Sequence, residues 1–463
     1  MVKIVCKAFV MKHTQLFKAS IITGIVIVCL FESRIASSES KKQKGNADAG
    51  ENAAQLPCFL AISDVHIDTS KAVTKYGDET GMDLWNSTTQ KISTIISTDK
   101  PTFIILLGDL PWHAKRDNPA QLNSAKGNTG FVLQNLRKIA VASKIPLLYV
   151  PGNNDSQGGD YDAFTVNGKT PFMLDAGGQL KWPMITGASS HNNNDPSIAD
   201  STQLKLGCYS AWPLGKKSHL RVIALNSVIF VNDKAYSANA TDDAAAEINW
   251  FKNQLIDAVN SKDFVLIAMH VPPGKNAFLN TLHNGKGFGK NMWDSTLLYE
   301  GKTVQDAFLD IVSQYKKSII GILGSHTHMD GIKILTDKCG GFSNFLISVP
   351  SITPDHLNNP GMKIISYDPS NNFSLVNFVT YYYAIGSTAQ TGWENSYSFD
   401  GIFNCPQNTP IREYIQSKIF DKKDTTGFLQ DVKSIYTVKS IMPNDNDMKT
   451  AVKVDHQKEH CTP

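Results

Sequence analysis

The sequence has no excess of charge of either sign, because 45 lysines and arginines are matched by 42 aspartates and glutamates. The small positive surplus lies in the first 37 residues, so the rest of the chain is close to neutral. A neutral chain offers no broad positive surface to phosphate backbones, and we expect no nucleic-acid partner. The chain also has no internal repeat and no heptad run, which excludes solenoid and coiled-coil architectures.

The N-terminal apolar run fits a signal peptide better than a membrane-spanning helix. Residues 21–31 supply about 11 mostly apolar positions, whereas a membrane-spanning helix needs about 20. The run follows a lysine-containing segment and precedes small residues at Ser37 and Ser38, as in signal peptides. We predict a signal peptide, or an uncleaved N-terminal anchor, at residues 1–38 and a polar linker at residues 39–56. The protein is expected to be secreted, periplasmic or luminal, with membrane anchoring as the alternative.

Cysteine is sparse, and the cysteines show no C-x-x-C signature of a structural zinc site. Beyond the predicted leader five cysteines remain, so at most two disulfides form and one thiol is left over. Their pairing cannot be read from the sequence. These residues are Cys58, Cys208, Cys339, Cys405 and Cys461.

From residue 58 onward, short apolar runs alternate with segments whose apolar residues recur at helical spacing. Strands are expected at residues 58–63, 103–108, 146–150, 221–226, 264–270 and 319–324. Helices are expected at residues 85–98, 130–143, 242–259 and 303–315. The alternation predicts an α/β fold. Because 463 residues exceed what one core usually holds, we expect a catalytic domain at residues 57–395 and a smaller, mainly helical C-terminal subdomain at 396–463.

Polar clusters follow the expected strands. They are "SDVHID" (63–68), "GDLPWH" (108–113), "GNND" (152–155), "MHVPPG" (269–274), "GSHTHMD" (324–330) and "SVPSITPD" (348–355). Ligands bind at the carboxyl ends of strands in open α/β sheets, so these clusters are expected to converge in space. Taken singly, each cluster has an ordinary explanation. Asp64 and His66 could be a turn carboxylate and a surface imidazole, and Asp109 could belong to a turn. His270 could be a hydrogen-bonded histidine of the core. His326 and His328 are a stronger indication of a metal site, because alternate residues of an extended segment point to the same side.

Taken together, these clusters predict a metal centre. Aspartate and histidine donors without cysteine suit Zn²⁺, with Mn²⁺ or Fe as alternatives. A carboxylate that bridges two cations about 3.5–4 Å apart gives the two-metal arrangement that serves in-line displacement at phosphorus. We therefore expect two divalent metal ions and hydrolysis of phosphoesters.

The motif order resembles that of the calcineurin-like metallophosphoesterases, whose motifs are D-x-H, G-D, G-N-H-[D/E], a lone His and G-H-x-H. This sequence matches the order from Asp64 to His328. Three further stretches, "GDLPWH", "HVPPG" and "PSITPDHLNNPGMKIISYD", look like the acid sphingomyelinase-like phosphodiesterase branch. The resemblance covers residues 60 to 385 or so. It implies a four-layer α/β/β/α sandwich with a small helical C-terminal appendage.

The resemblance also implies three ligands for each of two metal ions and one carboxylate that bridges them. The ligands are Asp64, His66 and His328 for the first ion, Asp109 for the bridge, and Asn153, His270 and His326 for the second ion. His113 is expected to sit beside the phosphate and protonate the leaving oxygen. Asn154 replaces the family histidine; its amide can donate a hydrogen bond to a phosphate oxygen but cannot deliver a proton.

Three functional hypotheses follow. The first is an exported dinuclear phosphoesterase that cleaves phosphodiester or phosphomonoester bonds of nucleotides, phosphocholine compounds or sphingomyelin-like lipids, by in-line attack of a metal-bridging hydroxide. The second is a phosphoanhydride hydrolase acting on polyphosphate or nucleoside polyphosphates, since the G-N-N-D form is similar to vacuolar endopolyphosphatases. The third is a catalytically weak metal-binding protein. Membrane contact is expected only through an uncleaved N-terminal segment or a lipid substrate, and the oligomeric state is left open.

Overall fold

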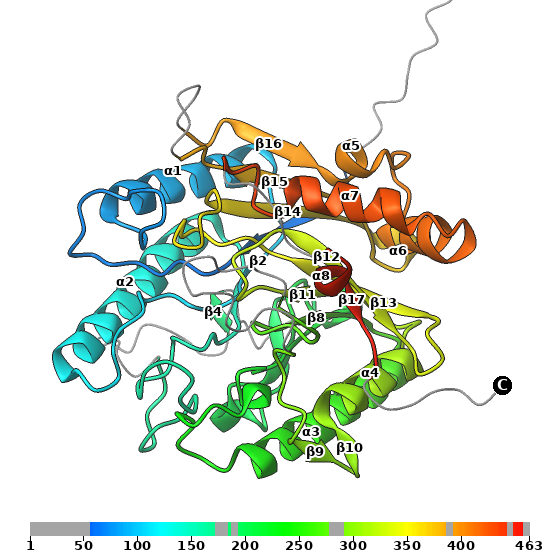
Figure 1. Ribbon diagram of the computed structural model, residues 1–463, viewed down its shortest axis with the longest axis horizontal. Helices are drawn as coiled ribbons and strands as arrows, with labels where there is room; N and C mark the ends of the chain where they lie inside the picture. Colours follow the sequence, from blue (N-terminus) through cyan, green and yellow to red (C-terminus); the bar gives the residue numbers. More distant parts are fainter. Residues whose placement is uncertain are drawn as a thin grey trace, which may run out of the picture. The chain divides into compact units, whose positions relative to one another are not determined.

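The strands of the folded part form two large sheets, drawn in Figure 1. The computed structural model describes residues 56–171, 184–186, 193–276, 291–385, 392–441 and 448–456. The predicted leader, nearly all of the polar linker and Cys461 lie outside the described residues, as do parts of both long loops. Gln55–Pro463 form one compact unit.

The first sheet has seven strands in the order β16-β15-β14-β1-β2-β3-β4. Its parallel centre pairs β1 with β2 and β2 with β3, and the other neighbours are antiparallel. The strands are β1 (Cys58–Ile62), β2 (Ile104–Leu106), β3 (Leu147–Tyr149), β4 (Met184–Thr186), β14 (Gly361–Asp368), β15 (Ser374–Tyr382) and β16 (Asn395–Ser398).

The second sheet has eight strands in the order β17-β12-β13-β11-β8-β7-β6-β5. Its parallel centre runs through β13, β11, β8 and β7. The strands are β5 (Ser197–Asp200), β6 (Tyr209–Trp212), β7 (Leu220–Ala224), β8 (Phe264–Ala268), β11 (Ile319–Gly324), β12 (Gly331–Thr336), β13 (Phe342–Ser348) and β17 (Lys453–Val454). A separate small hairpin joins β9 (Leu298–Tyr299) to β10 (Lys302–Thr303).

Helices cover the outer faces of the sheets. The four long ones are α1 (Met82–Thr98), α2 (Pro119–Ser143), α3 (Ala240–Asn260) and α4 (Val304–Gln314). The C-terminal segment adds α5 (Phe399–Phe403), α6 (Ile411–Ile415), a π-helix (Gln416–Asp421), α7 (Thr425–Ile435) and α8 (Met448–Val452). Short 3₁₀ helices lie at Leu204–Leu206, Lys216–Ser218, Ile229–Val231 and Pro369–Asn371. Among the described residues, no helix combines the length and hydropathy needed to cross a membrane.

The alternation of side chains along β1 shows how the layers form. Phe59 and Ala61 point into a core that both sheets share, whereas Leu60 and Ile62 point into a core shared with α1 and α2. A third core packs α3 and α4 against the other face of the second sheet. The result is the expected four-layer α/β/β/α sandwich with short C-terminal helices, visible in Figure 1.

Three of the cysteines are buried free thiols, and a fourth is bonded. Cys58, Cys208 and Cys405 are free, whereas Cys339 is disulfide-bonded. The C-terminal segment also supplies strands to both sheets, because β16 pairs with β15 and β17 pairs with β12. This segment is therefore tied to the sandwich by backbone hydrogen bonds as well as by its helices.

Candidate metal centre

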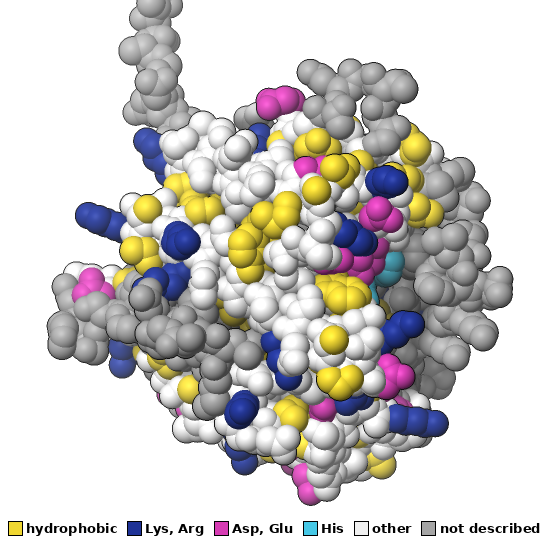
Figure 2. Space-filling view, turned by 90° about the vertical axis from the view of Figure 1, so that its left-hand side faces the viewer, with side chains coloured by type: hydrophobic (Ala, Val, Ile, Leu, Met, Phe, Trp, Pro, Cys, Tyr) yellow, Lys and Arg dark blue, Asp and Glu magenta, His cyan; other side chains and the backbone are white. Residues whose placement is uncertain are grey.

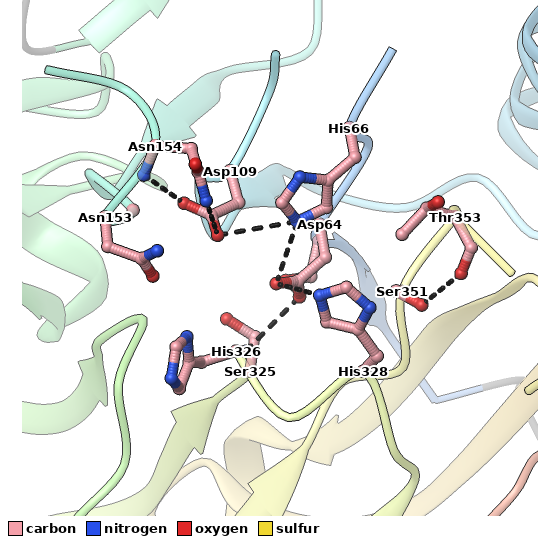
Figure 3. A network of polar contacts seen from close by, with 12 residues as sticks. Asp64, His66, Asp109, Asn153, Asn154, Ser325, His326, His328, Ser351 and Thr353 are labelled. Atoms are coloured by element: carbon pink, nitrogen blue, oxygen red, sulfur yellow. Dashed lines mark hydrogen bonds and ion pairs between the residues drawn. The ribbon is translucent and has the colours of Figure 1, made fainter. Parts of the chain in front are cut away.

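The predicted ligands come together where strands of both sheets end. Asp64 and His66 follow β1, Asp109 follows β2, and Asn153 follows β3. The remaining three, His270, His326 and His328, follow β8 and β11 of the second sheet. Figure 3 shows the side chains of Asp64, His66, Asp109 and His328 turned toward one another, with Asn153 and His326 beside them. The convergence that the strand ends predicted is therefore present.

Several ligand candidates have an unusual backbone conformation. Asp64, His66, Asp109, His326 and His328 have positive φ angles of 46°, 42°, 55°, 68° and 65°. Residues with a side chain rarely adopt this left-handed region, and such positions cluster at functional sites. The strand ends here are thus shaped to aim side chains at one point.

Two glycines let the loops that carry Asp109 and Asn153 approach closely. Gly108 has a φ of 83°, and a Cβ there would overlap the backbone of Gly152. A Cβ on Gly152 would in turn overlap Asp109. The glycines of the G-D and G-N motifs are therefore required by the contact between the two loops.

One trio of donors, which we call half-site 1, consists of Asp64, His66 and His328. All three are almost fully buried, and one donor atom from each lies within 4.8 Å of the others. Asp64 Oδ1 is 3.5 Å from His328 Nε2 and 4.0 Å from His66 Nε2. Asp64 Oδ1 and His66 Nε2 are also buried without a hydrogen-bond partner among the described residues. Buried polar atoms without partners are rare in folded proteins and fit a site that takes a cation.

The other trio, half-site 2, consists of Asn153, His270 and His326. His270 Nε2 is 3.1 Å from Asn153 Oδ1 and 3.2 Å from Asp109 Oδ2. Donor atoms of Asp109, His270 and His326 lie within 4.8 Å of one another. Asp109 Oδ2 is also 3.5 Å from His66 Nε2, so the Asp109 carboxylate lies between the two half-sites.

Three of the four imidazole rings are oriented through their Nδ1 atoms, whereas His326 is 3.4 Å from the Tyr161 hydroxyl through its Nε2 atom. His66 Nδ1 is 3.1 Å from Pro111 O, and His270 Nδ1 is 2.6 Å from Leu107 O. His328 Nδ1 is 2.7 Å from Asp355 Oδ1. An Nδ1–H that donates to an oxygen leaves Nε2 free to bind a metal, which is the usual arrangement of metal-binding histidines. The donor types, their tautomers and the unpartnered atoms all fit two divalent cations.

The charges in the centre are strongly coupled. Burial and the neighbouring His270 charge lower the pKa of His326 to about 3, so its ring is neutral. Burial alone would lower the pKa of His270, but the charges of Asp109 and Asp64 raise it to about 9. Although burial opposes it, the His270 and His66 charges hold the pKa of Asp109 well below its usual range. Asp109 is therefore an anion in the middle of the centre.

Asn154 faces the shared carboxylate. Its backbone N–H donates to Asp109 Oδ1 at 2.8 Å, and its side-chain Nδ2 donates to Asp109 Oδ2 at 3.0 Å. Asp155 holds the same loop, because its carboxylate accepts from the backbone N–H groups of Asp109, Leu110 and Gly152. Asn154, predicted to contact the phosphate, thus supports the position and charge of Asp109.

His113 lies at the edge of the centre, next to half-site 1. Its ring stacks on that of His66 with centroids 4.2 Å apart, and 43% of its side chain is exposed. Its Nδ1 is 2.8 Å from Glu79 Oε1 and 3.8 Å from Asp355 Oδ2. Burial alone would lower the pKa of His113, but the hydrogen bond and charge of Glu79, aided by Asp355, raise it to about 10. The ring is therefore a charged, proton-bearing group beside the metal ligands.

Residues that support the site were not found from the sequence. Glu79 holds His113, Asp355 holds His328, and Asp160 contacts Asn153 through a 2.7 Å hydrogen bond. Asp355 lies in the "SVPSITPD" cluster, where it could have been proposed as a partner for a histidine. Glu79 and Asp160 belong to loops with no motif, so no sequence signal pointed to them.

On the face drawn in Figure 2, histidine and acidic side chains lie together at the edge of the region drawn in grey. Elsewhere on this face, the positive and negative side chains of the described residues are interspersed.

Comparison with known proteins shows several relatives. Human cyclic GMP-AMP phosphodiesterase SMPDL3A is 28% identical over 241 residues, which are 50% of this chain and 49% of the relative. Sphingomyelinase phosphodiesterase C of Dictyostelium discoideum is 25% identical over 337 residues, 68% of this chain and 66% of the relative. Mouse acid sphingomyelinase-like phosphodiesterase 3b is 24% identical over 198 residues, 40% of each chain. The chain spans about half the length of the cyclic GMP-AMP phosphodiesterases that it matches.

Among solved structures, a dimetal phosphatase from Danio rerio aligns with a TM-score of 0.42 at 12% identity, over 74% of this chain and 98% of that one. The sequence model of the calcineurin-like phosphoesterases matches residues 59–330, which is more than half of the chain. The matched range contains the motifs from Asp64 to His328, and the chain belongs to the calcineurin-like phosphoesterase family.

Proposed function

We propose that the protein is an exported phosphoesterase that uses two divalent metal ions to hydrolyse phosphodiester or phosphomonoester bonds of small substrates. The observation that carries this proposal is the pair of donor trios on either side of Asp109, together with two donor atoms of half-site 1 that are buried without a hydrogen-bond partner among the described residues. The family uses a dinuclear metal centre. Zn²⁺ is the expected ion and Mn²⁺ or Fe the alternatives, because the donors are imidazole, carboxylate and amide oxygen. The export part of the proposal is supported by the apolar run at residues 21–31.

Each half-site would hold one ion, and the Asp109 carboxylate would contact both. Bound cations lower the pKa of water and neutralise the charge that develops on phosphoryl oxygens. Asp109 keeps its negative charge between the half-sites, and Asn154 holds its two oxygens in place with two hydrogen bonds. The chain's own contribution here is a rigid, buried set of donors that requires no reorganisation during the reaction.

His113 would protonate the leaving oxygen. It is held through Nδ1 by Glu79, which leaves Nε2 as the nitrogen that can donate a proton to a substrate. Asn154 cannot take this role, because an amide does not release a proton. Its backbone N–H and its Nδ2 group each donate one hydrogen bond to Asp109. In this proposal, His113 therefore supplies the proton that Asn154, at the position of the family histidine, cannot supply.

The names of the relatives favour small phosphodiesters as substrates. One relative is named as a cyclic GMP-AMP phosphodiesterase and another as a sphingomyelinase phosphodiesterase. We infer that nucleotides and phosphocholine compounds or lipids are the first substrates to test. A second candidate function, cleavage of phosphoanhydrides, is favoured by the placement of Asn154, because a phosphate leaving group needs less protonation than an alkoxide.

The experiment is a substrate panel on the purified chain with added Zn²⁺ or Mn²⁺. The panel contains cyclic GMP-AMP, sphingomyelin, bis-p-nitrophenyl phosphate, ATP and polyphosphate. Turnover of the diesters supports the proposal, and turnover of ATP and polyphosphate alone supports the second candidate. A folded chain that binds two ions and turns over none of the five would favour the catalytically weak metal-binding protein.

A further inference from the structure

Half-site 2 contains an amide ligand, and an amide can face a cation in two ways. Only the Oδ1 atom of Asn153 can bind a metal ion, whereas the Nδ2 group carries hydrogens and would be repelled. The two orientations have the same shape, so packing alone does not choose between them. The orientation of the amide therefore has to be set by a neighbouring group that only accepts, or only donates, hydrogen bonds.

Asp160 provides this distinction. Its Oδ1 atom is 2.7 Å from Asn153 Nδ2. An ionised carboxylate accepts hydrogen bonds and has none to donate, so it selects the NH₂ group. The Oδ1 atom of Asn153 is then directed to the other side, where it lies 3.1 Å from His270 Nε2. The contact with Asp160 therefore points the amide oxygen into half-site 2.

The backbone next to Asp160 fixes Asn153 as well. The N–H of Tyr161 donates to the backbone oxygen of Asn153 at 2.8 Å. Two successive residues thus hold both the main chain and the side chain of one ligand candidate. Asp160 is only partly buried, but the loop that carries it is closely anchored.

An ion pair secures that loop. Arg116 Nη2 is 2.9 Å from Asp162 Oδ2, and Arg116 Nε donates to the backbone oxygen of Gly158 at 3.3 Å. A Cβ on Gly158 would overlap the Asp162 carboxylate, so glycine is needed for this turn. Ser156 Oγ donates to Ala163 O at 2.6 Å across the base of the loop. These contacts make the loop a rigid support and not a loose cover.

We propose that Asp160 is a positioning residue that directs the amide oxygen of Asn153 into half-site 2 and thereby sets the affinity of that half-site alone for its cation. The proposal rests on the two-metal centre proposed above. Half-site 1 has no contact with Asp160 in the described part of the chain; its histidines are oriented by Pro111 and Asp355. Loss of a residue that orients a metal ligand typically lowers metal affinity by about 10–100-fold.

The test measures Zn²⁺ binding to the metal-free chain by isothermal titration, with the bound metal counted by elemental analysis. Asp160→Ala removes the acceptor, and Asp160→Asn removes the charge but keeps one acceptor oxygen. Asp233→Asn is the matched control, because this exposed carboxylate is close enough to raise the pKa of Asp160 through its charge. Thermal unfolding of each metal-free variant shows whether the fold is intact.

Two backgrounds separate the half-sites. In a His328→Ala chain, where half-site 2 is the intact one, adding Asp160→Ala should weaken the remaining Zn²⁺ site by about 10–100-fold. In a His326→Ala chain, where half-site 1 is intact, the same change should leave Zn²⁺ affinity unaltered. Asp160→Asn should lose less affinity than Asp160→Ala, and Asp233→Asn should match its parent.

Two results would overturn the inference. One is unchanged Zn²⁺ affinity in the His328→Ala background, and the other is an equal loss in both backgrounds, which would indicate a general structural role. A failure of the two-metal centre itself would look different, because the folded parent chain would then not take up two Zn²⁺ ions, and a failure of the proposed reaction alone would show as two bound ions without turnover in the parent chain.

Discussion

The two half-sites of the metal centre are supported by different parts of the fold. In half-site 1, a backbone carbonyl of Pro111 holds His66 and the carboxylate of Asp355 holds His328. In half-site 2, the backbone carbonyl of Leu107 holds His270, whereas Asn153 depends on the Asp160 carboxylate. Each half-site thus combines one contact from the main chain with one from an acidic side chain on a loop.

The two half-sites differ in what the acidic residue does: Asp355 contacts a histidine, whereas Asp160 contacts an amide. A histidine with its Nδ1 hydrogen-bonded presents Nε2 by the geometry of the ring, so Asp355 mainly fixes a tautomer. An amide presents either oxygen or nitrogen, so the contact with Asp160 determines whether Asn153 presents a ligand atom to half-site 2. We therefore expect half-site 2 to be the one that is more easily lost, and the following predictions test this expectation in order of effect.

Asp109→Ala should have the largest effect, because this carboxylate lies between the half-sites and contacts both. We expect loss of both metal ions and of turnover, by about 10³-fold or more, since bound metals supply several kcal/mol of charge stabilisation. Elemental analysis and turnover of bis-p-nitrophenyl phosphate measure the two effects. Retention of two ions and of turnover would disprove the assignment of Asp109 as the shared ligand.

His113→Ala should leave both half-sites occupied. His113 stacks on the ring of His66, but the contact of His66 Nδ1 with the Pro111 carbonyl does not depend on it. Loss of a general acid costs about 10²–10⁴-fold in turnover when the leaving oxygen needs a proton. We expect that loss with an alkyl ester substrate and a much smaller one with a p-nitrophenyl ester. Equal losses on both substrates would show that His113 binds the phosphate and does not protonate the leaving group.

Asp355→Ala is the counterpart of the change at Asp160 and should weaken half-site 1. Its carboxylate is 2.7 Å from His328 Nδ1, and loss of such a partner typically costs about 10–100-fold in metal affinity. In a His326→Ala background, Zn²⁺ titration should show this loss of affinity at half-site 1. Asp355→Asn should lose less affinity than Asp355→Ala. A comparable loss in a His328→Ala background would contradict the separation of the two half-sites.

The sequence predicted the strands and helices well where burial produces a regular pattern of apolar residues. The strand expected at residues 319–324 is β11 with the same bounds, because an uninterrupted apolar run suits a strand covered on both faces. The helix expected at 130–143 begins earlier, at Pro119 of α2, where Asn118 caps the N–H groups of Ala120 and Gln121. The added turns are mostly polar and contain Gly127, so they lack the apolar period that reveals a helix.

For the site, the sequence predicted the ligand candidates that lie together in the structure but not the residues that support them. Ordered motifs at strand ends brought seven ligand candidates to one place, since parallel strands deliver their carboxyl ends to a common edge. Glu79, Asp160 and Asp355 act through loops whose paths depend on long-range contacts, such as the Arg116–Asp162 pair. No spacing rule encodes such a path. The sequence also did not predict that the backbone N–H and the Nδ2 group of Asn154 both donate to Asp109.

The smallest effect on the metal centre should come from Glu247, a fully buried carboxyl on α3 that belongs to neither half-site. Burial raises its pKa from 4.5 to about 8, with the charge of Asp243 adding to the shift and hydrogen bonds from Asn226 and Cys208 opposing it. The folded chain therefore binds this proton more tightly than the unfolded chain. The contribution of Glu247 to the free energy of unfolding should be highest below about pH 4.5 and fall as pH rises toward 8, by up to about 1.4 kcal/mol per pH unit.

Glu247→Gln should remove this fall without changing Zn²⁺ stoichiometry, because the amide stays neutral at every pH and can still accept from the Asn226 N–H, a bond of 2.7 Å in the parent. Denaturant unfolding of the metal-free parent and variant between about pH 5 and pH 8 measures the difference in slope. Parallel slopes would show that Glu247 is already ionised in the folded chain. Changed Zn²⁺ binding would show that α3 is coupled to half-site 2 through β7 and β8, so the division of the centre into two independently supported halves would have to be redrawn.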